Sequence, residues 1–164
     1  MKGNDQKAEE NLKNARDKYS ACSGLQSDNN EIYFQWGICL IELGKRKSSY
    51  EDQLLLFNEA VEKFEKAISL DEKNLDKLII HSVETYKRIR RILDTKEKPI
   101  VPTELEQLFM SCFQMFKVVL MHRRDEKIFY QIGNLLVDWA KTKPSVNADE
   151  FYIRAAIMYE SALK

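Results

Sequence analysis

The sequence predicts an all-α fold, a right-handed superhelical array of antiparallel helix pairs with about seven helices, and three observations lead to this class. One observation is that a short pattern of small and aromatic residues, given below, returns along the chain, and that a glycine inside an aromatic or aliphatic run alternates with it. Only five Gly and three Pro interrupt 164 residues, whereas a sheet sandwich needs turn residues roughly every 8 to 12 positions. The repeated pattern is small-x-x-x-aromatic-x-x-small, and its four copies are Ala15-Tyr19-Cys22, Ala60-Phe64-Ala67, Cys112-Phe116-Val119 (with Val as the last residue) and Ala155-Tyr159-Ala162.

The spacing between the two signals is nearly constant. Gly37 follows Ala15 by 22 residues, and Gly133 follows Cys112 by 21. A supersecondary unit that returns at a fixed period stacks on its neighbours into an array. Because such arrays usually present an extended binding surface, we expect a protein that binds other proteins.

The first three helices follow from apolar spacing and from helix start and stop signals. The first is expected over residues 5–22, with Gly24 after it. The second starts after the polar run 27–30 and closes at Gly44. Ser48 or Ser49 caps the third, which reaches Leu70.

The remaining helices are separated by polar or proline-containing segments. Residues 71–74 are expected as a turn before a helix over 75–93, and residues 96–102 form the longest linker, because two prolines oppose helix there. Thr103 is expected to cap the fifth helix. The sixth and seventh are expected around 128–141 and from 147 onward, separated by Pro144.

We therefore expect a single domain over 1–164. Its parts are an opening helix (5–24) and three helical units, 28–72, 75–124 and 125–164. The last helix has no capping signal where the chain ends, so the sequence is also consistent with a fragment of a longer protein.

Composition narrows the function classes. Twenty-six basic and 26 acidic residues cancel, so we expect no global field that would hold nucleic acid. No run approaches the roughly 20 apolar residues of a membrane span, and the amino terminus lacks the apolar centre of a signal peptide. We expect a cytoplasmic protein, or one at the cytosolic face of an organelle membrane.

The three cysteines are expected to be reduced thiols. They cannot all pair with one another, and none stands in a C-x-x-C pattern or at metal spacing from a histidine. Cys22 and Cys112 occupy small-residue positions of the repeat, which predicts that both are buried. No metal and no cofactor is expected.

The repeats resemble tetratricopeptide repeats, a family of helix-turn-helix units. When Gly37 is placed on the family glycine, large residues fall on the family's large-residue sites, and the same holds for Gly133, with a weaker match around Val83. The flanking residues are Tyr33, Trp36 and Leu40, then Phe129, Ile132 and Leu136, then Ile79, Ser82 and Tyr86.

The chain departs from the family inside each unit. Ala60 follows Gly37 by 23 residues, where the family pattern has roughly 12, and the other two units are similarly long. The extra residues are expected to lengthen the helices and the loop of each pair. The segment 30–68 is also similar to the insertion-bearing repeat of the plant-type mitochondrial outer-membrane import receptor.

The resemblance implies a concave groove lined by the first helix of each unit. Phe34, Ile80 and Tyr130 take the same position in three successive units, which implies an apolar row suited to an amphipathic helix or an extended peptide. The groove positions of the family fall on Glu31, Phe34, Ile38, Ile41 and Glu42, on Lys77, Ile80, Glu84, Lys87 and Arg88, and on Lys127, Tyr130, Asn134, Val137 and Asp138.

Other interpretations of the same residues stay open. The apolar groove positions of the first unit are equally consistent with packing against the opening helix, which would make the chain a scaffold or adaptor subunit. A membrane-surface or import receptor whose anchor lies outside this chain is a further alternative. The basic runs 45–47, 87–91 and 122–124 offset helix-terminal charge or bind an acidic partner or phosphoinositide.

Two activities are not expected. The family's clamp for chaperone tails needs lysines, asparagines and an arginine, and of the residues at those positions only Lys127 fits. The five positions hold Phe34, Ile38, His81, Lys127 and Gln131. Catalysis is not expected either, because the two histidines lie far apart in the sequence and no nucleophile, phosphate-loop or metalloprotease motif is present.

Overall fold

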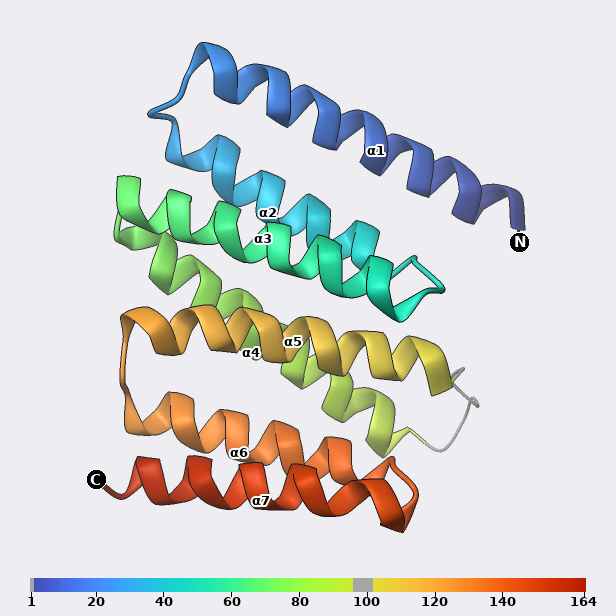
Figure 1. Ribbon diagram of the computed structural model, residues 1–164, viewed down its shortest axis with the longest axis vertical. Helices are drawn as coiled ribbons and strands as arrows, with labels where there is room; N and C mark the ends of the chain where they lie inside the picture. Colours follow the sequence, from blue (N-terminus) through green and yellow to red (C-terminus); the bar gives the residue numbers. More distant parts are fainter. Residues whose placement is uncertain (1, 96–101) are drawn as a thin grey trace. The chain divides into compact units, whose positions relative to one another are not determined.

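The computed structural model describes residues 2–95 and 102–164, and side chains within 6–95, 103–144 and 147–164. Over these residues the chain is all-α, as predicted, with seven helices and no strand (Figure 1). The proline linker expected at 96–102 lies outside the described residues except for Pro102. The helices are α1 (Lys2–Leu25), α2 (Asn30–Gly44), α3 (Tyr50–Leu70), α4 (Lys73–Asp94), α5 (Pro102–His122), α6 (Glu126–Lys141) and α7 (Ser145–Ala162).

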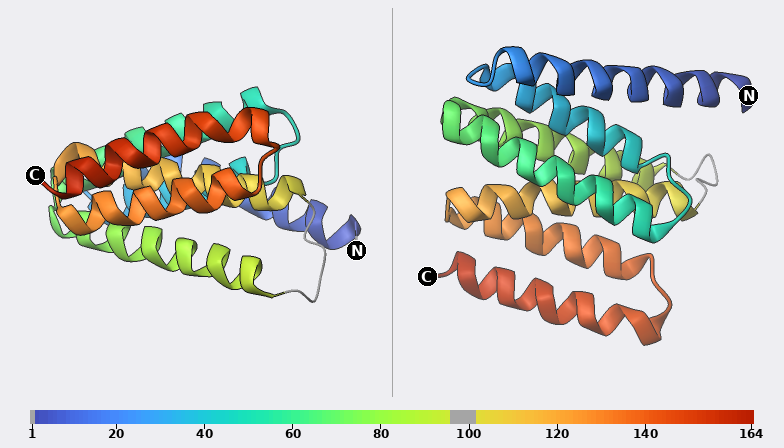
Figure 2. Two further views of the ribbon diagram at one scale, coloured as in Figure 1. Left: turned by 90° about the horizontal axis from the view of Figure 1, so that it is seen from below. Right: turned by 45° about the horizontal axis from the view of Figure 1, so that its top comes forward.

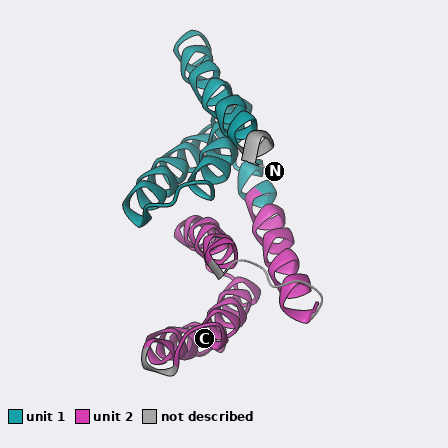
Figure 3. Cartoon of the chain, turned by 90° about the vertical axis from the view of Figure 1, so that its right-hand side faces the viewer, with its two compact units in different colours: residues 1–77 teal, residues 78–164 magenta. Residues whose placement is uncertain are grey.

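The chain divides into two compact units (Figure 3). Unit 1 is Met1–Lys77 and unit 2 is Leu78–Lys164. Helix α4 begins in unit 1 and continues into unit 2. The finer division into an opening helix and three helical units stays a prediction.

Local signals set most helix starts. Asn29 caps α2 by accepting from the backbone amides of Glu31 and Ile32, and Ser49 caps α3 by accepting from that of Asp52. Both caps lie where the sequence predicted them. Such a cap supplies an acceptor for an amide that has no partner within the helix.

Several expected boundaries were wrong, and helices α1, α6 and α7 also begin two or three residues earlier than expected. Helix α1 continues through Gly24 to Leu25, because a glycine inside a helix costs only about 1 kcal/mol. The turn after α3 is shorter than expected, since α4 begins at Lys73. Thr103 is not a cap, because α5 already begins at Pro102; proline suits the first helical position, where no amide donor is needed.

Unit 1 is built on the antiparallel pair α2 and α3, with α1 packed against α2 (Figure 1). Leu40, Phe57 and Phe64 are buried in this pair. A Cβ added at Gly37 would lie 2.6 Å from the Phe64 ring, and one at Gly44 would lie 2.5 Å from the Phe57 ring. The two glycines therefore let the rings of α3 approach the backbone of α2.

Unit 2 contains a second antiparallel pair, α6 and α7, and α5 packs against α6. Here a Cβ at Gly133 would lie 2.5 Å from the Tyr159 ring. Trp139 stacks on Phe109 of α5 at 5.4 Å between ring centroids, and its indole nitrogen donates to Glu106 at 2.8 Å. These contacts join α5 to α6.

The two helix pairs share a detailed packing arrangement. Gly37 receives the ring of Phe64, and Gly133 receives that of Tyr159. The aromatic residue three positions before each glycine also matches. The ring centroid of Phe34 lies 5.6 Å from that of Phe64, and the ring centroid of Tyr130 lies 5.7 Å from that of Tyr159. Internal repetition is therefore visible in the contacts as well as in the sequence.

The cysteines only partly follow the prediction. Cys112 is buried, as expected, but Cys22 is exposed, so the prediction for Cys22 was wrong. Cys22 lies near the end of α1. Burial raises the pKa of the Cys112 and Cys39 thiols.

Within the part of the chain that the structure describes, none of the helices combines the length and the apolar character needed to cross a bilayer.

Candidate functional site

The expected apolar row is not open along its whole length, because Phe34, its member in unit 1, is buried. Phe34 is 7% exposed and Ile41 only 2%, while Ile38 is half-buried. The Phe34 ring packs on Phe64, and the Lys77 ammonium lies 5.5 Å from its centroid. Phe34 and Ile41 therefore contribute to the core of unit 1, which favours packing within the unit, one of the two interpretations that the sequence left open.

The charged groove positions of unit 1 are paired. Lys77 donates to Glu31 at 2.7 Å, and Gln35 donates to the other carboxylate oxygen at 2.8 Å. These two hydrogen bonds, with that of Lys77 the larger influence, hold the pKa of Glu31 below its usual value. Glu42 pairs with Lys45.

Unit 2 presents the corresponding positions to solvent. Ile80 on α4 is 64% exposed, and Tyr130 on α6 is 55% exposed. Both side chains are accessible to a partner. The other predicted positions here are exposed (Glu84, Lys87, Arg88, Lys127) or half-buried (Asn134, Val137).

A buried carboxylate connects α4 to α6. Asp138, only 4% exposed, accepts from the Tyr86 hydroxyl at 2.8 Å and from the Arg90 guanidinium at 2.9 Å, and Lys141 donates to its second oxygen at 3.1 Å. Burial opposes ionisation of Asp138, but the three donors outweigh it and hold its pKa below the usual value. Burial and the Asp138 charge together raise the pKa of Tyr86.

The network corrects the expected role of Asp138 as a groove residue. A carboxylate that is buried and saturated with donors is not available to a ligand. Sequence reasoning missed Tyr86 and Arg90 as its partners, which lie 52 and 48 residues away. The only signal in the sequence was a single acid in the apolar stripe of a helix, which predicts that some donor must reach it.

The same hydrogen bonds set the register between α4 and α6. The two helices run in the same direction in each view (Figures 1 and 2). Asp138 follows its hydrogen-bond partners Tyr86 and Arg90 by 52 and 48 residues in the sequence. Tyr130 follows Ile80 by 50 residues, a separation between these two values. Ile80 and Tyr130 therefore lie on two helices that the hydrogen bonds of Asp138 connect.

Tyr130 is held in place from the side of α7. Its ring contacts Tyr159, whose hydroxyl donates to the Asn134 amide oxygen at 2.8 Å. Burial is the first cause of the raised pKa of Tyr159, which keeps the hydroxyl as a donor. Because Asn134 lies one turn after Tyr130, Tyr159 contacts both residues, Asn134 by the hydrogen bond and Tyr130 by the ring contact.

The remaining charges of this surface are mainly cationic. Glu84 and Lys87 form an ion pair with 2.7 Å between Nζ of Lys87 and Oε1 of Glu84, and that contact lowers the pKa of Glu84. For the side chains of Arg88 and Lys127 no acceptor is found among the residues that the structure describes. We define the α4–α6 face as Ile80, Glu84, Lys87, Arg88, Lys127, Tyr130, Asn134 and Val137.

The α4–α6 face combines apolar, amide and charged groups. It offers two exposed apolar groups, an amide and several ammonium or guanidinium donors, and the acid beside it is committed to its own donors. Over the described ranges 2–95 and 102–164, no group of three or more His, Cys, Asp or Glu side chains could hold a metal ion.

Comparison of the chain with protein-family models, with curated proteins and with solved structures gave no match.

Proposed function

We propose that this protein is a non-catalytic interaction module, and that its α4–α6 face binds a peptide or an amphipathic helix of a partner protein. The observation that carries the proposal is the exposure of Ile80 and Tyr130, each more than half exposed, on two helices that the hydrogen bonds of Asp138 connect. Exposed apolar side chains on two connected helices suit two apolar side chains of one bound segment.

The architecture proposed for the module is a right-handed superhelical array like that of tetratricopeptide repeats. Its support is the repeated packing of Phe64 on Gly37 and of Tyr159 on Gly133. In such arrays the first helices of successive units face the ligand. The proposal gives α4 and α6 that role.

The rim of the face favours an acidic partner. Arg88 and Lys127 supply positive charge, and Lys87 is already paired with Glu84. Charges at a rim affect the rate of association and the choice of partner more than the final affinity. We therefore propose a segment with apolar anchors and flanking carboxylates, bound by an adaptor that works in the cytoplasm without a cofactor.

The test is a selection from a displayed library of peptides of about 15 residues, since a helix of that length spans about 22 Å, close to the length of α6. Selected peptides are then measured by fluorescence anisotropy against the full chain and against Ile80→Glu and Tyr130→Glu. We expect each substitution to weaken binding by at least about tenfold, because each buries a charge at an apolar anchor site.

The matched control is Leu55→Glu. Leu55 is 69% exposed on α3, so the same change is made at a surface position outside the face. Circular dichroism establishes that all three variants are folded. Equal binding of the selected peptides by all three variants would place the binding site elsewhere and contradict the proposal.

A second candidate function, a structural scaffold whose groove is filled by its own helices, is favoured by one observation in unit 1. Phe34 and Ile41, the apolar groove positions of α2, are buried within the unit. Under this candidate no peptide is selected whose binding depends on Ile80 or Tyr130.

A further inference from the structure

We propose that unit 2 has a second docking site, away from the α4–α6 face, which holds an acidic amphipathic helix of a partner protein by one large apolar side chain. The site is a groove over α5, α6 and α7, here named the α5–α7 groove. One wall is a stripe of α5, Phe113, Lys117 and Leu120. Their spacing of four and then three residues puts all three on one side of the helix.

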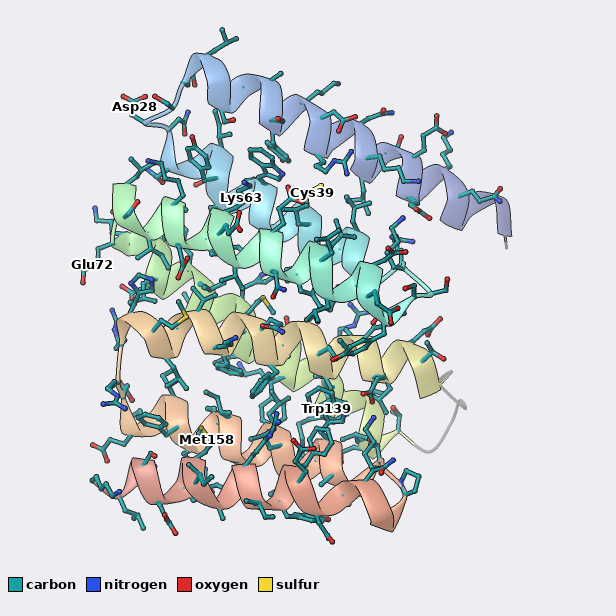
Figure 4. The ribbon with its side chains drawn as sticks, viewed as in Figure 1. Asp28, Cys39, Lys63, Glu72, Trp139 and Met158 are labelled. Carbon is teal, nitrogen blue, oxygen red and sulfur yellow. The ribbon has the colours of Figure 1, made fainter. Side chains whose placement is uncertain are left out.

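The floor and the second wall come from the helix pair that follows. Ile132, 1% exposed, lies in the floor on α6, and Ile157 forms the opposite wall on α7 next to Met158, which is labelled in Figure 4. Apart from two cations, all the side chains that line the groove are apolar. The groove is thus an apolar depression bounded by two helices and closed below by a third.

The size of the depression matches one side chain. Its volume is about 140 Å³. A cavity of about 150 Å³ lined by leucine, isoleucine and phenylalanine accepts a molecule of benzene. A phenylalanine or leucine of a bound helix therefore fits, as in other helix-in-groove complexes.

Helix α7 shows that the groove continues as an apolar surface. It buries Ala155 on one side, yet on another side Ile153 and Ile157, one turn apart, are 62% and 50% exposed. A helix at the surface of a globular protein normally has a polar face there. A partner helix that inserted one side chain into the groove would cover this exposed pair along its length.

The charged residues of the groove indicate the charge of the partner helix. Lys117 and Arg154 are the charged residues of its lining. No acceptor for Lys117 is found within the described part of the chain, and Arg154 pairs with Glu150 in an exposed contact at 2.5 Å. Because an exposed pair of this kind contributes little, a carboxylate of the partner can take over Arg154. Two cations across an apolar depression therefore favour acidic helices and disfavour basic ones.

The experiment uses a defined probe and the full chain. The probe is an alanine-rich helical peptide of about 15 residues with one phenylalanine and a glutamate one turn before and one turn after it. It is titrated into the protein while the methyl resonances of Ile132, Leu136 and Ile157 are followed by NMR. We expect saturable shifts of these methyl groups, and no saturable shifts when the phenylalanine of the probe is replaced by alanine.

Charge reversal supplies the second arm. The double variant Lys117→Glu, Arg154→Glu should bind the probe at least about tenfold more weakly, and it should prefer a probe whose two glutamates are replaced by lysines. Both positions are exposed, so the fold tolerates the change. The matched control reverses Lys7 and Lys18, two exposed cations of α1, and should leave binding unchanged.

Three results would overturn the proposal. One is the absence of saturable shifts up to about 1 mM probe, which would mean a binding free energy weaker than about 4 kcal/mol. Another is equal binding of the glutamate and lysine probes by the unaltered chain. The third is concentration-dependent dimerisation in sedimentation velocity that Ile157→Glu abolishes, because the occupant would then be a second copy of this chain. Ile80→Glu should leave probe binding unchanged, so failure here and failure of the α4–α6 face are distinguishable.

Discussion

The hydroxyl of Tyr86 on α4 donates a 2.8 Å hydrogen bond to the buried carboxylate of Asp138 on α6, across 52 residues of sequence. Arg90, one turn further along α4, donates to the same oxygen at 2.9 Å. This single acid therefore determines how α4 and α6 are aligned in unit 2, and with them the apolar anchors Ile80 and Tyr130.

Asp138→Ala should destabilise unit 2 by about 1 to 3 kcal/mol, because it leaves the buried Tyr86 hydroxyl without its acceptor. Urea denaturation followed by Trp139 fluorescence measures this in a Trp36→Phe background, which leaves one tryptophan, in unit 2. Glu150→Ala breaks an exposed pair instead and should change stability by less than about 0.5 kcal/mol. Equal effects of the two substitutions would contradict the role given to Asp138.

Gly133→Ala should destabilise the protein by about 1 to 3 kcal/mol, because its Cβ would lie 2.5 Å from the Tyr159 ring and the ring must move. Gly24→Ala is the control, since a Cβ there meets nothing within 4 Å and alanine is the better helix former. We expect it to stabilise by up to about 1 kcal/mol. Thermal unfolding followed by circular dichroism compares the two variants, and a stabilising Gly133→Ala would show that the close packing is absent in solution.

Phe34→Glu should cost more than about 3 kcal/mol, whereas Tyr130→Glu should cost less than about 1 kcal/mol. Phe34 is 7% exposed, so the substitution would bury an unpaired charge, while Tyr130 is 55% exposed and the new carboxylate would stay in water. Chemical denaturation of the two variants measures the difference. A mild effect of Phe34→Glu would mean that this position is open, as the sequence resemblance implied.

Glu9 on α1 should titrate near pH 2 in the folded chain. Hydrogen bonds from Lys47 and then Lys13, at 2.8 and 2.9 Å, lower the pKa of Glu9 to about 2. A carboxyl whose pKa is lower in the folded than in the unfolded state stabilises the fold above the unfolded pKa, near 4.5. That contribution is lost as the pH falls from about 4.5 to about 2.

NMR titration of the Glu9 side chain gives this pKa directly. Lys47→Ala removes the larger of the two donors and should move the pKa of Glu9 upward toward its ordinary value. The contact joins α1 to the segment between α2 and α3, so faster hydrogen exchange in α1 should accompany the shift. An unchanged pKa in Lys47→Ala would show that the pair does not persist in solution.

Cys22 should react with N-ethylmaleimide in the native protein well before Cys39 and Cys112. Cys22 is exposed, whereas burial both hides the other two thiols and raises their pKa, which lowers the fraction of reactive thiolate. Peptide mass spectrometry after a short exposure measures modification at each site. Denaturant should make the three rates similar, and modification of Cys112 as fast as that of Cys22 without denaturant would contradict the buried position.

The helical class and many helix starts follow from the sequence because their causes are local. Asn29 and Ser49 cap helices with their own side chains, and apolar residues at three- and four-residue steps need no distant partner to be recognised. The repeated small and aromatic residues are the ones that pack together, since Phe64 lies on Gly37 and Tyr159 on Gly133. Thr103 and Gly24 were misjudged because a local signal can be overridden at modest cost.

Exposure was decided by the tertiary structure. Phe34 and Tyr130 hold equivalent repeat positions and make equivalent ring contacts, yet one is buried and the other is not. Lys77, 43 residues after Phe34, lies over the Phe34 ring. Likewise Asp138 is a buried acid because Tyr86 and Arg90 reach it from another helix. Local patterns determine which side of a helix is apolar, but only residues distant in sequence determine which apolar side remains uncovered for a partner.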